Sequence, residues 1–263
     1  MLFSSLPMYD LPELRPQWDR LWQAVRQELA AQGIAVEAGL VRDADYHQNW
    51  YKPGLLLGQT CGWPFVCGVR DHALPFVRFD FGVASTPGHY FSQIIASPSL
   101  ADRIAEKGWR AAMDDPAIRF AVNSRDSQSG FRALGELADW PVELPTGRLV
   151  ISGSHRNSIK AVAQGEAEIS AIDAVSWQLL ERFEPAAAGV RLAGHTSEVP
   201  GLPLIISKAN ALHLPVVRDA LEKAVRNLSP ADRTALLIVG LVEANAADYG
   251  VLEKPPFGNL RFA

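Results

Sequence analysis

Short apolar runs alternate along the chain with longer segments whose apolar residues recur every three or four positions. The clearest of these segments covers residues 14–29, with Trp18, Trp22 and Val25 on the spacing of one buried helix face. We expect further helices over residues 61–70, 99–112, 127–137, 155–164, 175–183 and 216–228, and one that begins at Ser229. We expect strands over residues 2–7, 34–40, 55–57, 74–84, 90–96, 118–122, 148–152, 167–172 and 202–207.

This alternation of strands with helices predicts βαβ units and parallel sheets, so the expected fold class is α/β. Ser99 and Asp102 have the spacing of a capping box at the start of one helix. The chain has no fixed-period repeat and no low-complexity tract. Two loop-rich stretches, residues 85–89 and 198–203, are candidate crossing points between two lobes.

Composition narrows the classes of function. With 263 residues, 48% of them hydrophobic and 21% charged, the chain is long enough for one or two packed cores and too apolar for a disordered protein. Its 25 Lys and Arg against 29 Asp and Glu give a net charge of −4, which argues against a nucleic-acid-binding or anionic-membrane-binding surface. An anionic ligand would therefore have to be held by local dipoles and a few placed side chains.

No apolar stretch approaches the roughly 18–20 residues of a membrane span, so we expect no membrane insertion. Residues 1–14 lack both a basic segment and an apolar core, and so do not have the pattern of a signal peptide. Cys61 and Cys67 are too few for a disulfide framework or a zinc site, and we expect two buried thiols.

Polar residues follow several of the expected strands, and ligands of open α/β sheets bind at the carboxyl ends of strands. The most informative segment covers residues 120–131, where a strand leads through Ser127 and Ser129 into a helix. Such a helix start directs backbone N–H groups and the positive end of the helix dipole at an anion, and Gly130 allows close approach of a ligand. The alternative interpretation is an ordinary Ser/Asp helix cap.

His155 and Asp173 occupy two further strand-to-helix junctions. His155 can donate to a ligand oxygen, or it can be a histidine with satisfied hydrogen bonds at a helix start. Asp173 can pair with a ligand ammonium group, or it can cap the helix that follows. Tyr9 and Trp63 are candidate pocket walls, although aromatic residues near Pro and Gly more often serve packing.

Enzyme signatures are weak by comparison. Ser154, His155 and Asp173 are the residue types of a hydrolytic triad, but no serine lies in a G-x-S-x-G elbow. Cys61 lacks the surroundings of a papain-type nucleophile. Neither a dinucleotide-binding fingerprint nor a P-loop occurs, and no His/Glu helix pair suggests a metal. We therefore expect no catalytic residues, no cofactor and no metal site.

Five segments resemble, in the same order, the phosphonate/phosphite-binding proteins of ABC importers. They are residues 55–65, 90–95, 123–131, 152–162 and 165–173, and the resemblance spans roughly residues 2–230. It implies a two-lobed type 2 periplasmic-binding-protein fold with two crossing segments and a ligand cleft between the lobes. The implied first lobe comprises residues 1–88 and 203–263, and the second comprises residues 89–202.

The resemblance also implies a set of ligand-binding residues: Tyr9, Gln59, Thr60, Ser127, Gln128, Ser129, His155 and Asp173. In that family a helix start with hydroxyl residues holds the phosphonate, which corresponds to residues 127–129 here. An aspartate holds the amino group of aminophosphonates, which corresponds to Asp173. This chain departs from the family pattern at Gln128, where a small hydroxyl residue is usual.

The leading prediction is a non-enzymatic solute-binding protein that closes around a small oxyanion, such as a phosphonate or phosphate, for an ABC-type uptake system. Its expected partners are that small anionic ligand and an ABC transporter permease, without nucleic acid. The resemblance favours the periplasm, whereas the missing signal-peptide pattern favours the cytoplasm. Two alternatives on the same fold stay open: a cytoplasmic enzyme, like those of the menaquinone pathway, and a metabolite sensor.

Overall fold

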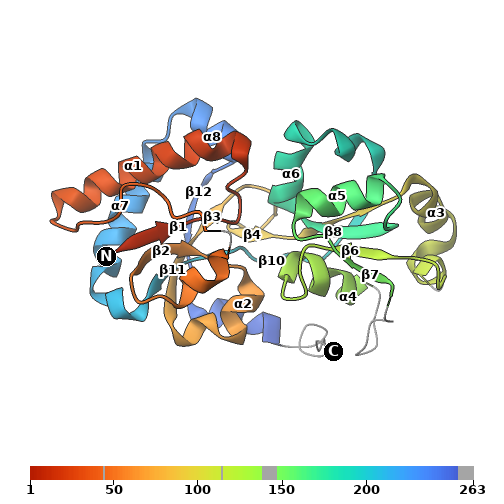
Figure 1. Cartoon of the computed structure of the whole chain (residues 1–263), viewed down its shortest axis with the longest axis horizontal. Helices are drawn as coiled ribbons and strands as arrows, with labels where there is room; N and C mark the ends of the chain where they lie inside the picture. Colours follow the sequence, from red (N-terminus) through yellow and green to blue (C-terminus); the bar gives the residue numbers. More distant parts are fainter. Residues whose placement is uncertain (44, 114, 138–146, 254–263) are drawn as a thin grey trace. The chain divides into compact units, whose positions relative to one another are not determined.

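The computed structural model describes residues 1–43, 45–113, 115–137 and 147–253. They form two compact units, each with its own five-stranded sheet (Figure 1). Of the described residues, those within Met1–His89 and Pro200–Gly250 form unit 1, and those within Tyr90–Val199 together with Val251–Glu253 form unit 2. At the two places where the chain changes unit, the short strands β4 (His89–Tyr90) and β10 (Val199–Pro200) pair with each other.

The sheet of unit 1 is mixed. Its strands, in spatial order, are β1 (Phe3–Ser5), β2 (Leu55–Gln59), β11 (Pro203–Ser207), β3 (Ala73–Asp80) and β12 (Gly240–Glu243). β1 and β2 are parallel, and the other neighbouring strands are antiparallel. Because β1 and β2 run in the same direction, the residues that follow them lie at the same edge of this sheet.

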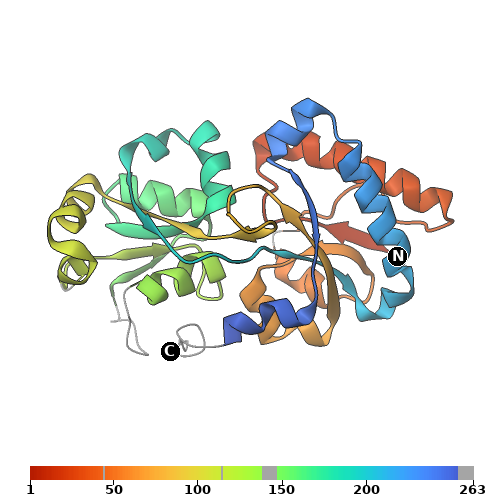
Figure 2. The same cartoon turned by 180° about the vertical axis from the view of Figure 1, so that it is seen from behind.

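Helices cover both faces of this first sheet. In Figures 1 and 2, α1 (Arg15–Ala31) and α8 (Pro230–Leu236) lie on one side and α2 (Gly62–Cys67) lies on the other. α1 buries Trp18, Leu21, Trp22, Val25 and Leu29, the face that the sequence predicts. α7 (Leu214–Arg226) packs along it, with Lys223 Nζ 3.2 Å from Glu28 Oε2. Full burial of one such apolar side chain is worth about 1.5–3 kcal/mol, so this face holds α1 on the sheet.

Short 3-10 helices fill many of the connections. In unit 1 these are η1 (Pro12–Leu14), η2 (Tyr46–Tyr51), η3 (Val69–Asp71) and η6 (Lys208–His213), and η7 (Ala246–Glu253) ends the described chain. In unit 2, η5 (Pro185–Gly189) follows the last helix.

The sheet of unit 2 contains three adjacent parallel strands. Its spatial order is β7 (Leu149–Ile151), β6 (Phe120–Val122), β8 (Ile169–Asp173), β5 (Ser92–Ala96) and β9 (Arg191–His195). β6 is parallel to both β7 and β8, whereas β5 is antiparallel to β8 and β9. The carboxyl ends of β6, β7 and β8 therefore meet at one edge, and β5 ends at the opposite edge.

Four α-helices and one π turn complete unit 2. They are α3 (Pro98–Met113), the π turn η4 (Gln128–Arg132), α4 (Ala133–Leu137), α5 (His155–Ala163) and α6 (Ala174–Phe183). α5 and α6 lie on one side of the sheet and α4 on the other (Figures 1 and 2). Leu100 of α3, Phe131 of η4 and Leu134 of α4 share one apolar core with strand residues such as Val122.

Two local predictions are wrong. Residues 34–40 form no strand, only a single bridge between Val36 and Leu2, because the chain follows β1 briefly and then bends at Ala38 and Gly39. The helix over residues 98–113 starts beside Ser97, whose Oγ accepts from the Leu100 N–H at 3.4 Å. Asp102 instead forms an ion pair with Arg191, so there is no capping box at Ser99.

Other differences concern edges and ends. β9 and β12 are absent from the predicted strands, because they are edge strands whose pairing is set by distant residues. Cys61 is partly buried and Cys67 is exposed, so the prediction of two buried thiols is wrong. Val251–Glu253 group with unit 2, because Arg132 donates from Nη2 to the Leu252 carbonyl at 3.0 Å. None of the described helices is long and apolar enough to cross a membrane.

Candidate ligand-binding site

Three helical segments begin at the same edge of the unit 2 sheet. η4 follows β6, α5 follows β7 and α6 follows β8, and these three strands are parallel neighbours. The residues predicted from the sequence at these junctions, Ser127–Ser129, His155 and Asp173, therefore share one edge. Helix starts present unpaired backbone N–H groups and the positive end of the helix dipole, a combination suited to an anion.

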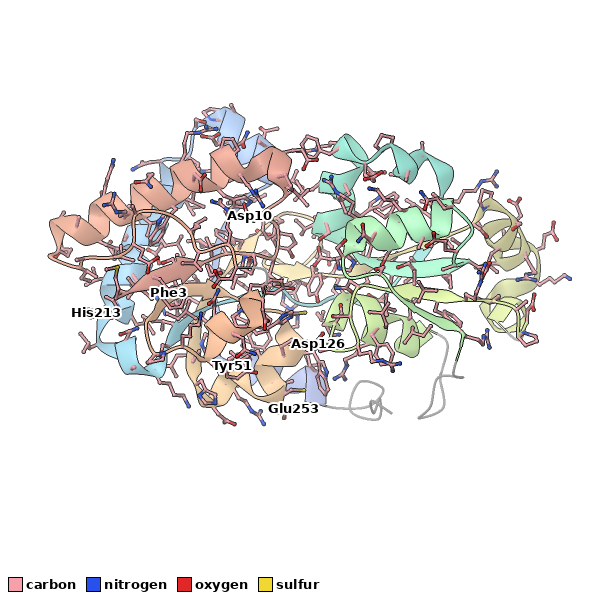
Figure 3. All side chains as sticks on the ribbon, viewed as in Figure 1. Phe3, Asp10, Tyr51, Asp126, His213 and Glu253 are labelled. Atoms are coloured by element: carbon pink, nitrogen blue, oxygen red, sulfur yellow. The ribbon has the colours of Figure 1, made fainter. Side chains whose placement is uncertain are left out.

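The junction after β6 is the best-formed of the three. Asp126, labelled in Figure 3, directly precedes Ser127. Ser127 caps η4, since its Oγ accepts from the Gly130 N–H at 2.9 Å. Ser127 is therefore a helix cap, as the alternative interpretation predicts. Capping uses its oxygen as an acceptor, so the hydroxyl group can also donate its proton to a ligand. Ser127, Gln128 and Ser129 are all buried, at 3–5% exposure.

Gly130 is required at this junction for steric reasons. A Cβ atom on this residue would lie 2.1 Å from Asn123 Oδ1 and 3.1 Å from Ser127 Oγ. Both distances are shorter than van der Waals contact, so the loop closes this tightly only around glycine. Asn123, the residue directly after β6, is consequently part of the same cluster, although the sequence reasoning did not select it.

His155 links the second helix start to the first. Its Nε2 lies 2.9 Å from Ser129 Oγ, and Ser154 caps α5 by accepting from the Asn157 N–H at 3.1 Å. Burial lowers the pKa of His155 to about 4, so the imidazole is neutral at pH 7. Its Nδ1 is buried and has no partner among the described residues. The ring therefore provides a neutral donor or acceptor at this edge rather than a positive charge.

Asp173 performs the structural role that was one of its two interpretations. Its Oδ1 accepts from the Ser176 N–H at 2.9 Å and caps α6, and the residue is 3% exposed. Asp173 also ends β8, opposite Ser92 of β5 in the ladder.

The remaining predicted residues lie in unit 1, at the edge where β1 and β2 end. The Tyr9 carbonyl accepts from Trp18 Nε1 at 3.0 Å, and its ring packs edge-on against Phe81 at 4.9 Å. The next residue, Asp10, labelled in Figure 3, binds Arg42 at 2.5 Å. These contacts fix the segment after β1.

Gln59 ends β2 and Thr60 follows it, and both are fully buried. The Gln59 carbonyl accepts from Trp50 Nε1 at 2.9 Å, and the Thr60 N–H donates to Pro203 at 3.2 Å. The side-chain amide of Gln59 has no partner at either end among the described residues. Unit 1 thus gathers three predicted residues and unit 2 the other five.

The site combines helix starts that carry hydroxyl groups with a neutral imidazole and with buried polar atoms that have no partner among the described residues. On an α/β fold of two units, these features define a binding protein for a small polar solute. In the described part of the chain, no three His, Cys, Asp or Glu side chains are grouped so as to hold a metal ion.

The chain belongs to the ABC transporter phosphonate periplasmic substrate-binding protein family, which it matches over residues 3–249. The resemblance seen in the sequence, the two-lobed α/β fold and the solute-binding role for an ABC-type transporter are thereby confirmed. No curated protein matches the sequence.

Solved structures share this fold at low sequence identity. A binding protein component of an ABC phosphonate transporter from Pseudomonas aeruginosa has a TM-score of 0.69 and 17% identity, covering 96% of this chain and 84% of that chain. PhnD1 from Prochlorococcus marinus (MIT 9301), in complex with methylphosphonate, has a TM-score of 0.67 and 15% identity, with 96% of each chain covered. A Xanthomonas citri protein bound to ATP has a TM-score of 0.63 and 14% identity, covering 96% and 98%.

Proposed function

We propose that this protein binds a small phosphorus oxyanion, a phosphonate or phosphate, and presents it to an ABC permease. The observation that carries the proposal is the junction of η4 and α5, where two capped helix starts are joined by the 2.9 Å contact between Ser129 and His155. A phosphonate in the PhnD1 structure of the same fold agrees with this class of ligand. Tyr9, Gln59 and Thr60 are proposed as ligand contacts on the family resemblance alone.

The physical basis is local, since the chain has a net charge of −4. Burying an anion costs many kcal/mol unless each oxygen is hydrogen-bonded. Fixed N–H and O–H donors offset this cost, because charge-assisted hydrogen bonds are about twice as strong as neutral ones. Ser127 supplies a hydroxyl donor, and Ser129 supplies another in the tautomer in which His155 Nε2–H donates to its Oγ. The start of η4 supplies backbone N–H groups.

We also propose that the site has no catalytic activity. Ser129 and His155 have the contact expected of a nucleophile and its base, but such a base needs a third group that orients it. His155 Nδ1 has no partner among the described residues, and the Asp173 carboxylate caps α6 instead. This arrangement favours binding over acyl transfer.

Isothermal titration calorimetry of the purified protein tests the proposal directly. We expect binding of methylphosphonate, phosphite or phosphate, and none of a neutral sugar or a neutral amino acid. If only neutral compounds bind, the oxyanion proposal is wrong. The protein is also incubated with the compound that it binds, and phosphorus NMR of the mixture should show that the compound is chemically unchanged.

Replacing both Ser127 and Ser129 with alanine should weaken phosphonate binding by at least about 100-fold, because two hydrogen bonds to a charged group are worth about 1.5–3 kcal/mol each. The loss of the η4 cap should lower the free energy of unfolding by about 1 kcal/mol. The measurements are calorimetric titration and urea unfolding.

The matched control is the double substitution Ser97→Ala, Ser99→Ala. It also removes a helix-capping hydroxyl, but at the opposite edge of the unit 2 sheet. It should cost similar stability and leave phosphonate affinity unchanged. Equal loss of affinity in both variants would argue against the assigned site.

Asp173→Asn separates capping from ligand binding, because asparagine caps helices about as well as aspartate. We expect the free energy of unfolding to change by less than about 0.5 kcal/mol. Affinity for 2-aminoethylphosphonate should fall about 10-fold, since the ammonium group loses its carboxylate, whereas affinity for methylphosphonate should not fall. A similar loss for both ligands would show that Asp173 has only a structural role.

A further inference from the structure

Two buried side-chain amide oxygens in unit 2 have no hydrogen-bond donor among the described residues. They are Asn123 Oδ1 and Gln128 Oε1. Gln128 is 3% exposed, and it is the first residue of η4. Together with His155 Nδ1, they are buried polar atoms that the fold itself leaves unsatisfied at the strand-to-helix junctions of this edge.

Both residues lie in the segment that forms the candidate site, Asn123 directly after β6 and Gln128 at the start of η4. Asn123 Oδ1 lies against Gly130 and is close to the capping hydroxyl of Ser127, as the space around Gly130 shows. The Asn123 carbonyl also accepts from the Gly153 N–H at 3.0 Å, which ties the end of β6 to the loop before α5. Gln128 lies between the two serines proposed to hold the oxyanion.

A buried carbonyl oxygen without a donor costs about 1–3 kcal/mol. A fully ionised oxyanion has only acceptors, so it leaves this cost in place and adds repulsion between lone pairs. An oxyanion that keeps one proton has a P–OH group, which donates to such an oxygen while its other oxygens accept from the serines and the backbone. Phosphoryl groups keep this second proton to about pH 6, whereas sulfate and sulfonates carry none.

Resting on the proposed function, we infer that Asn123 and Gln128 are specificity-determining residues that select an oxyanion with its own O–H donor, a monoprotonated phosphorus oxyanion, over a fully ionised sulfur oxyanion.

Calorimetry at about pH 6 with four probes tests the inference: methylphosphonate, methanesulfonate, sulfate and 2-aminoethanesulfonate. We expect methylphosphonate to bind at least about 10-fold more tightly than each sulfur compound, the value of one hydrogen bond to a charged group. The aminosulfonate carries N–H donors without a P–OH group, so equally tight binding of this probe would overturn the assignment to P–OH.

Two variants assign the preference to residues. Gln128→Leu and Asn123→Ala should each reduce the ratio of methylphosphonate to methanesulfonate affinity to within about 3-fold. The matched control is Gln164→Leu, the same chemical change at the far end of α5, which should keep the wild-type ratio. The ratio is insensitive to a general loss of stability, and circular dichroism verifies folding.

The outcomes separate the two proposals. If methylphosphonate binds tightly and neither variant changes the ratio of methylphosphonate to methanesulfonate affinity, the inference is wrong and the proposed function stands. Equal affinity of the unmodified protein for methylphosphonate and methanesulfonate also overturns the inference and leaves the proposed function in place. Binding of none of these oxyanions, or of phosphate, contradicts both.

Discussion

Acidifying the protein from pH 7 to about pH 4.5 should lower its free energy of unfolding by about 2–3 kcal/mol through His155 alone. Burial lowers the pKa of His155 from 6.5 to about 4 in the folded chain. Between these two values the unfolded state binds the proton and the folded state does not. Stability is therefore complete above pH 6.5 and is lost as the pH falls toward 4. Urea unfolding at several pH values measures this slope.

The variant His155→Gln should remove this slope, because glutamine does not titrate. The exposed His72→Gln is the matched control and should retain it. Asp232 contributes at lower pH, because the hydrogen bond from Arg20 lowers its pKa below the usual 3.8 and its stabilisation is lost only as the pH falls below that value. If the His155→Gln protein loses stability with the same slope as the unmodified chain, the neutral buried imidazole is not the cause.

The second large effect is expected for Gly130→Val, which should abolish measurable phosphonate binding and destabilise unit 2 by about 1–3 kcal/mol. The added Cβ would meet Asn123 Oδ1 at 2.1 Å, so either η4 or the end of β6 must move. Movement of η4 displaces both hydroxyl donors. Calorimetric titration and urea unfolding measure the two effects.

Gly240→Val is the control, since a Cβ at Gly240 has open space and lies in a strand, where valine is favourable. A sharper test compares Gly130→Ala with the double variant Gly130→Ala, Asn123→Ala. The second substitution removes the nearest clashing atom, so the double variant should recover part of the stability that Gly130→Ala loses. Normal binding by Gly130→Val would contradict the tight closure of the η4 junction.

The order of elements could be predicted because its signals are local. The helix starts at Ser127 and Ser229 and the buried face of α1 depend on residues within a few positions of each other. Residues 34–40 have the composition of a strand, but forming one requires a partner, and only Val36 has one. Strands β9 and β12 were not predicted, because their pairing with β5 and β3, rather than their own sequence, makes them strands.

The candidate site divides in the same way. Ser127, Ser129, His155 and Asp173 could be selected because each follows an apolar strand and begins a helix. The contact between Ser129 and His155 joins residues far apart in the sequence, and only the order of parallel strands brings them together. Asn123 lies in the segment 123–131 that resembles the family, but its importance depends on the space next to Gly130 and on an unpaired side-chain oxygen, which no sequence pattern encodes.

The position of β11 in the unit 1 sheet has a consequence for synthesis on the ribosome. β11 lies between β2 and β3, yet it is translated only after all strands of the unit 2 sheet. Unit 2 can therefore complete its sheet while β2 and β3 of the nascent unit 1 still have open edges. Open edges pair readily with other chains. The growing chain is thus most vulnerable to aggregation in the interval before β11 emerges, and a chaperone that covers those edges would act during that interval.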